Sequence, residues 1–180
     1  MGAVRDDSMQ QAIIKRISDC YIPAGICGGV YSWHMNSAER IDLPALRFAG
    51  LTARVSNAEP ELIGDHWQRF QADETVARIT GKANPNVYAV YTEYESDYTG
   101  AYTLLIGYSV EADAAVPGGL RVIEVPAQQY AVILASGEQP QATISAWQWV
   151  WASALDRAYT ADFDEYIAPG DVRLHVAVRS

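Results

Sequence analysis

The segment Pro126-Ala127-Gln128-Gln129-Tyr130-Ala131 repeats the pattern of Pro44-Ala45-Leu46-Arg47-Phe48-Ala49, and this repeat decides the fold class. In both segments Pro-Ala is followed, after two further residues, by an aromatic residue and an alanine. The offset is constant at 82 residues, from 44 to 126 and from 48 to 130. A fixed internal offset indicates a duplicated supersecondary unit. The sequence therefore predicts two related halves, about residues 41–112 and 119–180.

The first half has the predicted order strand, helix, strand, strand. Residues 41–55 are typical of a strand that is kinked at its Pro-Ala pair, and residues 62–79 place apolar side chains at helical spacing. One long amphipathic helix is expected there. Residues 87–110 are rich in β-branched and aromatic residues on either side of a polar turn at residues 96–100, which predicts a hairpin.

The second half follows the same order. Residues 120–136 predict a strand, residues 142–155 a helix, and residues 163–167 and 172–178 two strands joined by a turn at Ala168-Pro169-Gly170-Asp171. The predicted fold class is α+β. Two pseudo-symmetric β-α-β-β modules would form an antiparallel sheet with a central cleft and two long helices.

Charge and composition restrict the functional class. Nearly half of the residues are hydrophobic (49%) and the formal net charge is −9, which fits a globular domain and disfavours a nucleic-acid surface of clustered Lys and Arg. An acidic excess attracts cations at long range, although solubility alone also favours it. The sequence has no run of about 18 apolar residues and no leader pattern, so no membrane contact is expected.

Residues 1–40 differ from the rest and are expected to form an N-terminal extension. Its apolar segments would pack on the domain, on a second copy in a homodimer, or on a DNA-binding partner protein. Cys20 and Cys27 belong to no zinc or redox motif, so free thiols and a cytoplasmic location are expected. His66 and His175 lack a third ligand at recognisable spacing, so neither a metal site nor a cofactor is predicted.

The predicted hairpin offers the main candidates for a binding site. Strand alternation places Tyr91 and Glu93 on one face, and Tyr88 and Tyr94 on the other. A ring beside a carboxylate suits a flat organic cation, through cation–π attraction of roughly 0.5–2 kcal/mol per contact. Glu93 is therefore predicted as the pocket acid, with a surface or salt-bridged role as the alternative. Tyr88 is a further candidate, since tyrosine suits pockets through its apolar ring and polar hydroxyl.

The second half adds tryptophan and acidic candidates. Trp147 and Trp151 lie one helical turn apart, and Trp151 is expected in the core. Trp149 lies off that stripe, where an exposed tryptophan would line a pocket or an interface. Asp164 and Glu165 are neighbours on a predicted strand, so at most one of them can point inward.

Several segments resemble one known family in type and order: Tyr88 to Asp97, Ile106-Gly107, Ile123 to Ala131, Trp147, and Asp162-Phe163-Asp164-Glu165-Tyr166. This is the effector-binding domain family named after the bacterial DNA gyrase inhibitor, which also forms the ligand-sensing half of AraC-type and MerR-type transcription regulators. The sequence is most similar to its stand-alone integron-cassette branch, over about residues 41–179. The effector-binding domain is accordingly assigned to residues 41–180.

The resemblance implies a cleft between two modules that takes bulky, often cationic aromatic compounds by ring stacking and pairing with a buried acid. It implies ligand-binding roles for Trp147, Asp164 and Tyr166. Asp164 matches a glutamate of the family pattern with one methylene less. The last strand departs from the family, because Arg173 and His175 stand where an acidic residue is common.

The expected function is binding of an aromatic, cationic small molecule, rather than catalysis. The domain would act as a stand-alone binder, or as a regulator-type sensor without a DNA-binding part of its own. The alternative is a hydrolase of reactive natural products, in which a carboxylate such as Glu93 acts on water and a tyrosine protonates the leaving carbon.

Overall fold

The computed structural model describes residues 38–179. The expectations for Cys20, Cys27 and most of the N-terminal extension fall outside the described residues. The elements are, in order, β1 (Glu39–Leu43), β2 (Leu46–Val55), α2 (Pro60–Ala72), α3 (Glu74–Ala77), β3 (Lys82–Thr92), β4 (Tyr102–Val110), β5 (Arg121–Val125), β6 (Gln128–Ser136), α4 (Gln141–Ala152), β7 (Ala161–Ala168) and β8 (Asp171–Ala177).

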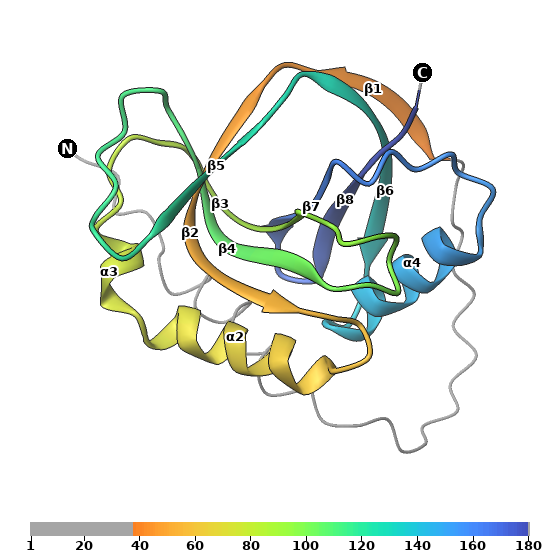
Figure 1. Cartoon of the computed structure of the whole chain (residues 1–180), viewed down its shortest axis with the longest axis horizontal. Helices are drawn as coiled ribbons and strands as arrows, with labels where there is room; N and C mark the ends of the chain where they lie inside the picture. Colours follow the sequence, from red (N-terminus) through yellow and green to blue (C-terminus); the bar gives the residue numbers. More distant parts are fainter. Residues whose placement is uncertain (1–37, 180) are drawn as a thin grey trace.

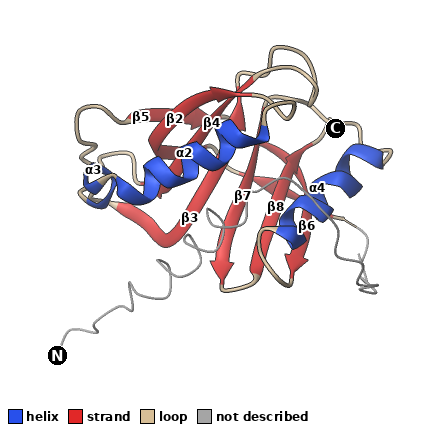
Figure 2. Cartoon of the chain, turned by 90° about the horizontal axis from the view of Figure 1, so that it is seen from below, coloured by secondary structure: helices blue, strands red, loops and turns tan. Residues whose placement is uncertain are grey.

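The strands form one antiparallel sheet in the order β1-β6-β8-β7-β3-β4-β2-β5 (Figure 1). The two halves meet at its centre, where β3 pairs with β7 from Val87↔Tyr166 to Thr92↔Ala161. Helices α2 and α4 pack on one face of the sheet (Figure 2), because their apolar sides share a single core with it. The predicted α+β class is confirmed.

Each Pro-Ala pair divides one predicted strand into two. Proline has no N–H to donate to a strand ladder, so pairing stops at Pro44 and Pro126. β1 then pairs with β6 of the second half (Ile41↔Tyr130), while β5 pairs with β2 of the first (Phe48↔Ile123). The halves thus exchange their outermost strands, and the sheet curls so that its two ends approach each other (Figure 1).

The prediction of a single helix at residues 62–79 is wrong. Asp73 is extended (φ −88°, ψ 103°), and its Oδ1 accepts a hydrogen bond from the backbone N–H of Thr75 at 2.6 Å. Aspartate is a favoured helix cap, so it ends α2 and starts the short α3. The amphipathic pattern itself is present, because Ile63, Trp67 and Phe70 of α2 are buried against the sheet.

The sheet has a buried core on each face. The core under the helices contains Trp67, Leu104, Ile106, Trp147 and Leu174, among others. On the opposite face, inside the curl, a second core forms around Phe48, Tyr88, Leu105, Tyr130 and Phe163. No helix of residues 38–179 is long and apolar enough to cross a membrane.

Candidate ligand-binding site

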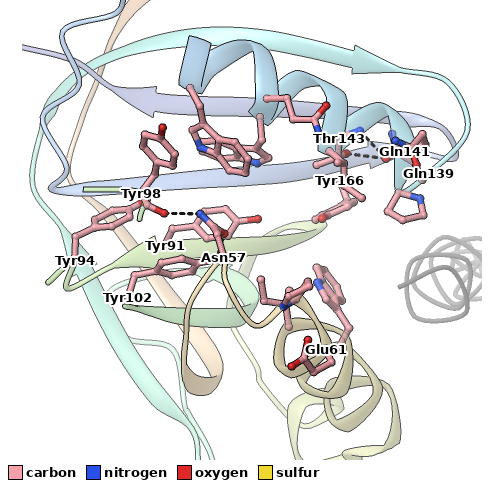
Figure 3. Close-up of a pocket in the computed structure, with 18 of the residues that line it drawn as sticks. Asn57, Glu61, Tyr91, Tyr94, Tyr98, Tyr102, Gln139, Gln141, Thr143 and Tyr166 are labelled. Carbon is pink, nitrogen blue, oxygen red and sulfur yellow. Dashed lines mark hydrogen bonds between the residues drawn. The ribbon is translucent and has the colours of Figure 1, made fainter. Parts of the chain in front are cut away.

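A cavity of about 510 Å³ lies between α2, α4 and the centre of the sheet (Figure 3). That volume is in the range of pockets for drug-sized molecules. Its walls are mainly aromatic. The tyrosines that line it are Tyr91, Tyr94, Tyr98, Tyr102 and Tyr166, and the tryptophans are Trp67, Trp147 and Trp151.

Glu93 explains why Tyr91 and Tyr94 both reach this cavity, although simple alternation placed them on opposite faces. Glu93 follows β3 with a φ of 52°, in the left-handed region that residues other than glycine seldom adopt. This turn interrupts the strand period, so Tyr94 swings to the side of Tyr91. Tyr102, at the start of β4, contacts both rings, with centroids 5.7 Å from Tyr91 and 5.6 Å from Tyr94.

Asp164 lies fully buried on β7, directly behind the cavity wall. Its Oδ2 accepts a hydrogen bond from the Tyr91 hydroxyl at 2.6 Å, and the Trp147 indole N–H donates to both carboxylate oxygens at 3.2 Å. Burial raises the pKa of Asp164 to about 7, although the Tyr91 and Trp147 hydrogen bonds oppose the shift. Among the described residues no Lys or Arg pairs with this carboxylate.

Asp162 is the second buried acid, two residues earlier on the same face of β7. It accepts hydrogen bonds from the Tyr94 hydroxyl (2.6 Å), from Nη2 of Arg157 (2.6 Å) and from the backbone N–H of Ala177 (2.7 Å). Arg157 lines the cavity and is itself buried, so this ion pair is shielded from water. The carboxylate of Asp162 is therefore compensated, and that of Asp164 is not.

An aromatic stack forms part of the cavity wall. Tyr98, in the loop after β3, lies parallel to Trp151 of α4, with a centroid distance of 5.2 Å and an angle of 9°. Asn57 fixes that loop, because its Nδ2 donates to the carbonyl of Tyr98 at 2.7 Å (Figure 3), and its Oδ1 accepts from the Tyr102 hydroxyl at 2.8 Å. The loop, α2 and α4 thus meet above the aromatic walls.

Comparison with known proteins agrees with this architecture. Residues 41–178 match the family described as integron-associated effector binding protein (Cass2). The chain belongs to this family. Its sequence resemblance to effector-binding domains, including the integron-cassette branch, is thereby confirmed.

Two curated relatives are named as regulators. The chain is 32% identical over 128 residues to the putative transcriptional regulator protein YobU of Bacillus subtilis, covering 67% of this chain and 80% of YobU. It is 31% identical over 105 residues to the transcriptional regulator BrlR of Pseudomonas aeruginosa, covering 58% of this chain but only 37% of BrlR.

Two solved structures share the fold. The integron cassette protein VCH_CASS2, from the mobile metagenome of Vibrio cholerae, is 28% identical with a TM-score of 0.67, over 81% of this chain and 97% of that one. SAV2435, solved bound to tetraphenylphosphonium, is 18% identical with a TM-score of 0.66, over 81% of this chain and 95% of its own.

The structure places Glu93, the predicted pocket acid of this Cass2 family member, outside the cavity. Arg121 of β5 binds its carboxylate with two hydrogen bonds, and the Thr103 hydroxyl donates a third at 2.6 Å. These bonds lower the pKa of Glu93 to about 2, Arg121 contributing most. The salt-bridge alternative therefore describes this residue, whose side chain is 47% exposed.

Tyr88 and Trp149 also lie away from the cavity. Tyr88 points to the opposite face of the sheet, where its hydroxyl donates to Glu165 Oε1 at 3.1 Å and accepts from Asn84 at 2.8 Å. Trp149 is part-buried against the core under the helices and does not line the cavity. Strand alternation directs Tyr88 to the face of the sheet opposite the cavity. Trp149 lies off the stripe of α4 that faces inward.

Three predicted residues, Tyr91, Trp147 and Tyr166, do line the cavity, and Asp164 lies behind two of them. Asp164 points toward the cavity side while Glu165 points away, as neighbours on a strand must. Trp151, expected in the core, is partly buried against it and also stacks on Tyr98 at the cavity. Sequence reasoning missed the Arg157–Asp162 pair; alternation from Asp164 would have found Asp162, whereas Arg157 lies in a loop without a regular pattern.

Proposed function

We propose that the cavity binds a bulky aromatic cation, and that Asp164 supplies the counter-charge instead of Glu93. The observation that carries this proposal is a fully buried carboxylate without a cationic partner among the described residues, behind walls made of rings. An isolated buried carboxylate is costly unless something compensates it. A cation in the cavity would do so.

The geometry supports an indirect contact. Asp164 does not itself line the cavity, but Tyr91, whose hydroxyl donates to it, does. That hydrogen bond makes the Tyr91 side chain more negative, because donation to a carboxylate polarises the hydroxyl. The surrounding rings add cation–π attraction of about 0.5–2 kcal/mol per contact. The ligand would therefore meet negative potential over several rings at once.

The relatives support a sensing role. SAV2435 has the same fold and was solved with an aromatic cation, and both curated relatives are named as transcriptional regulators. The chain spans only 37% of BrlR. The proposal is that this domain senses its ligand and, if it regulates transcription, acts through a separate DNA-binding protein.

Fluorescence titration with two matched ions tests the proposal. Tetraphenylphosphonium and tetraphenylborate have nearly the same shape and opposite charge, and the three tryptophans that line the cavity report on occupancy. Saturable quenching is expected with the phosphonium and not with the borate. Equal affinity for both ions would show that shape alone determines binding, and would refute the role of a buried acid.

The hydrolase alternative uses the same cavity but needs a different acid. Glu93 cannot act there, since it pairs with Arg121 outside. The remaining candidate is the Asp164–Tyr91 pair, in which the buried carboxyl group accepts a hydrogen bond from a tyrosine that lines the cavity. Incubation with an excess of a strained-ring alkylating compound separates the two functions: a binder consumes none, and a hydrolase forms product beyond one equivalent.

A further inference from the structure

The two acids behind the cavity are equally buried and differ in whether an arginine pairs with them. Asp162 and Asp164 are both 0% exposed, both on the same face of β7, and each accepts a hydrogen bond of 2.6 Å from a tyrosine that lines the cavity. Asp162, however, is paired with Arg157. The net charge buried at this site is therefore set by whether an arginine stands beside the second acid.

Arg157 is held so that its guanidinium stays at the cavity. Its backbone bridges to Val178, its Nη2 donates to Asp162, and its charge lies 4.3 Å from the ring centroid of Tyr159 and 5.6 Å from that of Trp147. The residue is only 5% exposed and lines the cavity, so a bound ligand would contact it directly.

Within residues 38–179 the other charged group of the cavity lining is Glu61, at the start of α2, which is exposed. Water and salt screen an exposed carboxylate strongly, whereas charges in the buried cluster interact at low dielectric. The ligand's charge is therefore balanced by the buried cluster: two carboxylates and one guanidinium, which leaves one negative charge when Asp164 is ionised.

We propose that Arg157 is a specificity-determining residue that limits the cavity to aromatic monocations by neutralising Asp162. This rests on the proposed function of cation binding. A ligand with a single delocalised charge is matched by Asp164. A second charge on a rigid ligand would lose its hydration without a counter-charge, and it would lie in the same cavity as Arg157, so the site discriminates by repulsion as well as by attraction.

A rigid series of bipyridines isolates charge from shape. 4,4′-Bipyridine, N-methyl-4,4′-bipyridinium and N,N′-dimethyl-4,4′-bipyridinium carry zero, one and two charges at pH 8 on nearly the same skeleton. Binding is measured by tryptophan fluorescence, with tetraphenylphosphonium as a separate monovalent probe. The monocation is expected to bind about tenfold more tightly than either the neutral compound or the dication.

Three variants change the charges of the Arg157–Asp162 pair, singly and together. Arg157→Met keeps an apolar stem beside the rings but frees the charge of Asp162, so the preference should move toward the dication. Asp162→Asn leaves Arg157 to balance Asp164, so affinity for the monocation should fall about tenfold. The double variant R157M/D162N removes both charges and should restore the wild-type order of the three compounds. Removing a buried pair together is also tolerated better than removing one partner.

The outcomes separate this inference from the function on which it rests. Absence of binding of tetraphenylphosphonium and of every bipyridinium would overturn the proposed function. If the cations bind but wild type takes the dication as tightly as the monocation, the role of Arg157 is refuted while cation binding stands. The same holds if the double variant fails to restore the preference although its circular dichroism spectrum matches that of wild type.

Discussion

The two halves of the domain, β1 to β4 and β5 to β8, both run strand, strand, helix, strand, strand, with the short α3 added in the first, but they contribute different chemistry to the cavity. The first half supplies rings: Tyr91, Tyr94, Tyr98 and Tyr102 all come from β3, β4 and the loop between them. The second half supplies the buried charges on β7 and just before it, together with the tryptophans of α4. The duplicated framework creates the space, and departures from the duplication determine what the space can bind.

The connecting turns show the difference most directly. β7 and β8 are joined by the compact Pro169-Gly170 turn, whereas β3 and β4 are separated by residues 93–101. The longer loop begins with the left-handed Glu93 and carries Tyr98 to the cavity wall. A short turn pairs two strands, and a long one can also carry side chains over a cavity.

Removing the charge from the second half should have the largest effect. Asp164→Asn is expected to weaken tetraphenylphosphonium binding on the order of 100-fold, or about 2.7 kcal/mol, because the cation loses its buried counter-charge. Thermal stability should not fall, since an isolated buried carboxylate is costly to the fold. Fluorescence titration and thermal melts measure the two quantities.

Glu165→Gln is the matched control for that variant. It removes one charge from the adjacent residue of β7, on the opposite face of the sheet. Cation affinity should stay within about twofold of wild type, because this side chain does not face the cavity. If the Glu165 and Asp164 variants weaken binding equally, net charge and not the buried site accounts for the affinity.

The pH dependence of binding should follow Asp164. Its pKa in the free protein is raised to about 7 by burial, so the carboxyl is mainly neutral at pH 6 and mainly ionised at pH 8. Only the ionised form attracts a cation, so affinity should increase about tenfold between these values and then level off. Titrations with tetraphenylphosphonium, whose charge does not change with pH, measure this; a flat profile would exclude Asp164 as the counter-charge.

Removing a ring from the first half should have a smaller effect on binding. Tyr98→Ala abolishes the stack with Trp151 and should weaken binding about fivefold, since such aromatic pairs contribute roughly 1 kcal/mol. Tyr98→Phe keeps the stack and serves as the control. Stopped-flow fluorescence should show faster dissociation for the alanine variant alone.

The acid in the first half should matter least for the ligand. Glu93→Gln breaks a half-exposed ion pair with Arg121, and such pairs are worth about 0–1 kcal/mol of stability. A slightly lower melting temperature with cation affinity within about twofold of wild type is expected. A loss of affinity comparable to that of the Asp164 variant would contradict the assignment of the charges to the second half.

The fold was largely predictable from the sequence, because the 82-residue repeat and the apolar patterns report on local structure and duplication. The interruption at Asp73 and the division of each first strand at Pro-Ala changed the number of elements without changing their order.

The site was less predictable. Alternation correctly put Asp164 and Glu165 on opposite faces without saying which of them points inward, and a single left-handed residue, Glu93, reversed the faces of the residues after it. The cation that pairs with a carboxylate is set by tertiary contacts. No helix or strand periodicity places Arg121 beside Glu93 or Arg157 beside Asp162.

The claim that Asp164 balances the charge of the ligand is tested most directly by measuring the protons released on binding. Calorimetric titration with tetraphenylphosphonium at pH 7, in two buffers of different ionisation enthalpy, gives the number of protons released per ligand. About half a proton is expected, because a carboxyl group with a pKa near 7 is half protonated before the cation binds and ionised afterwards. Release should vanish at pH 9 and in the Asp164→Asn variant. Tight binding without proton release at pH 7, or unchanged release in that variant, would contradict the account.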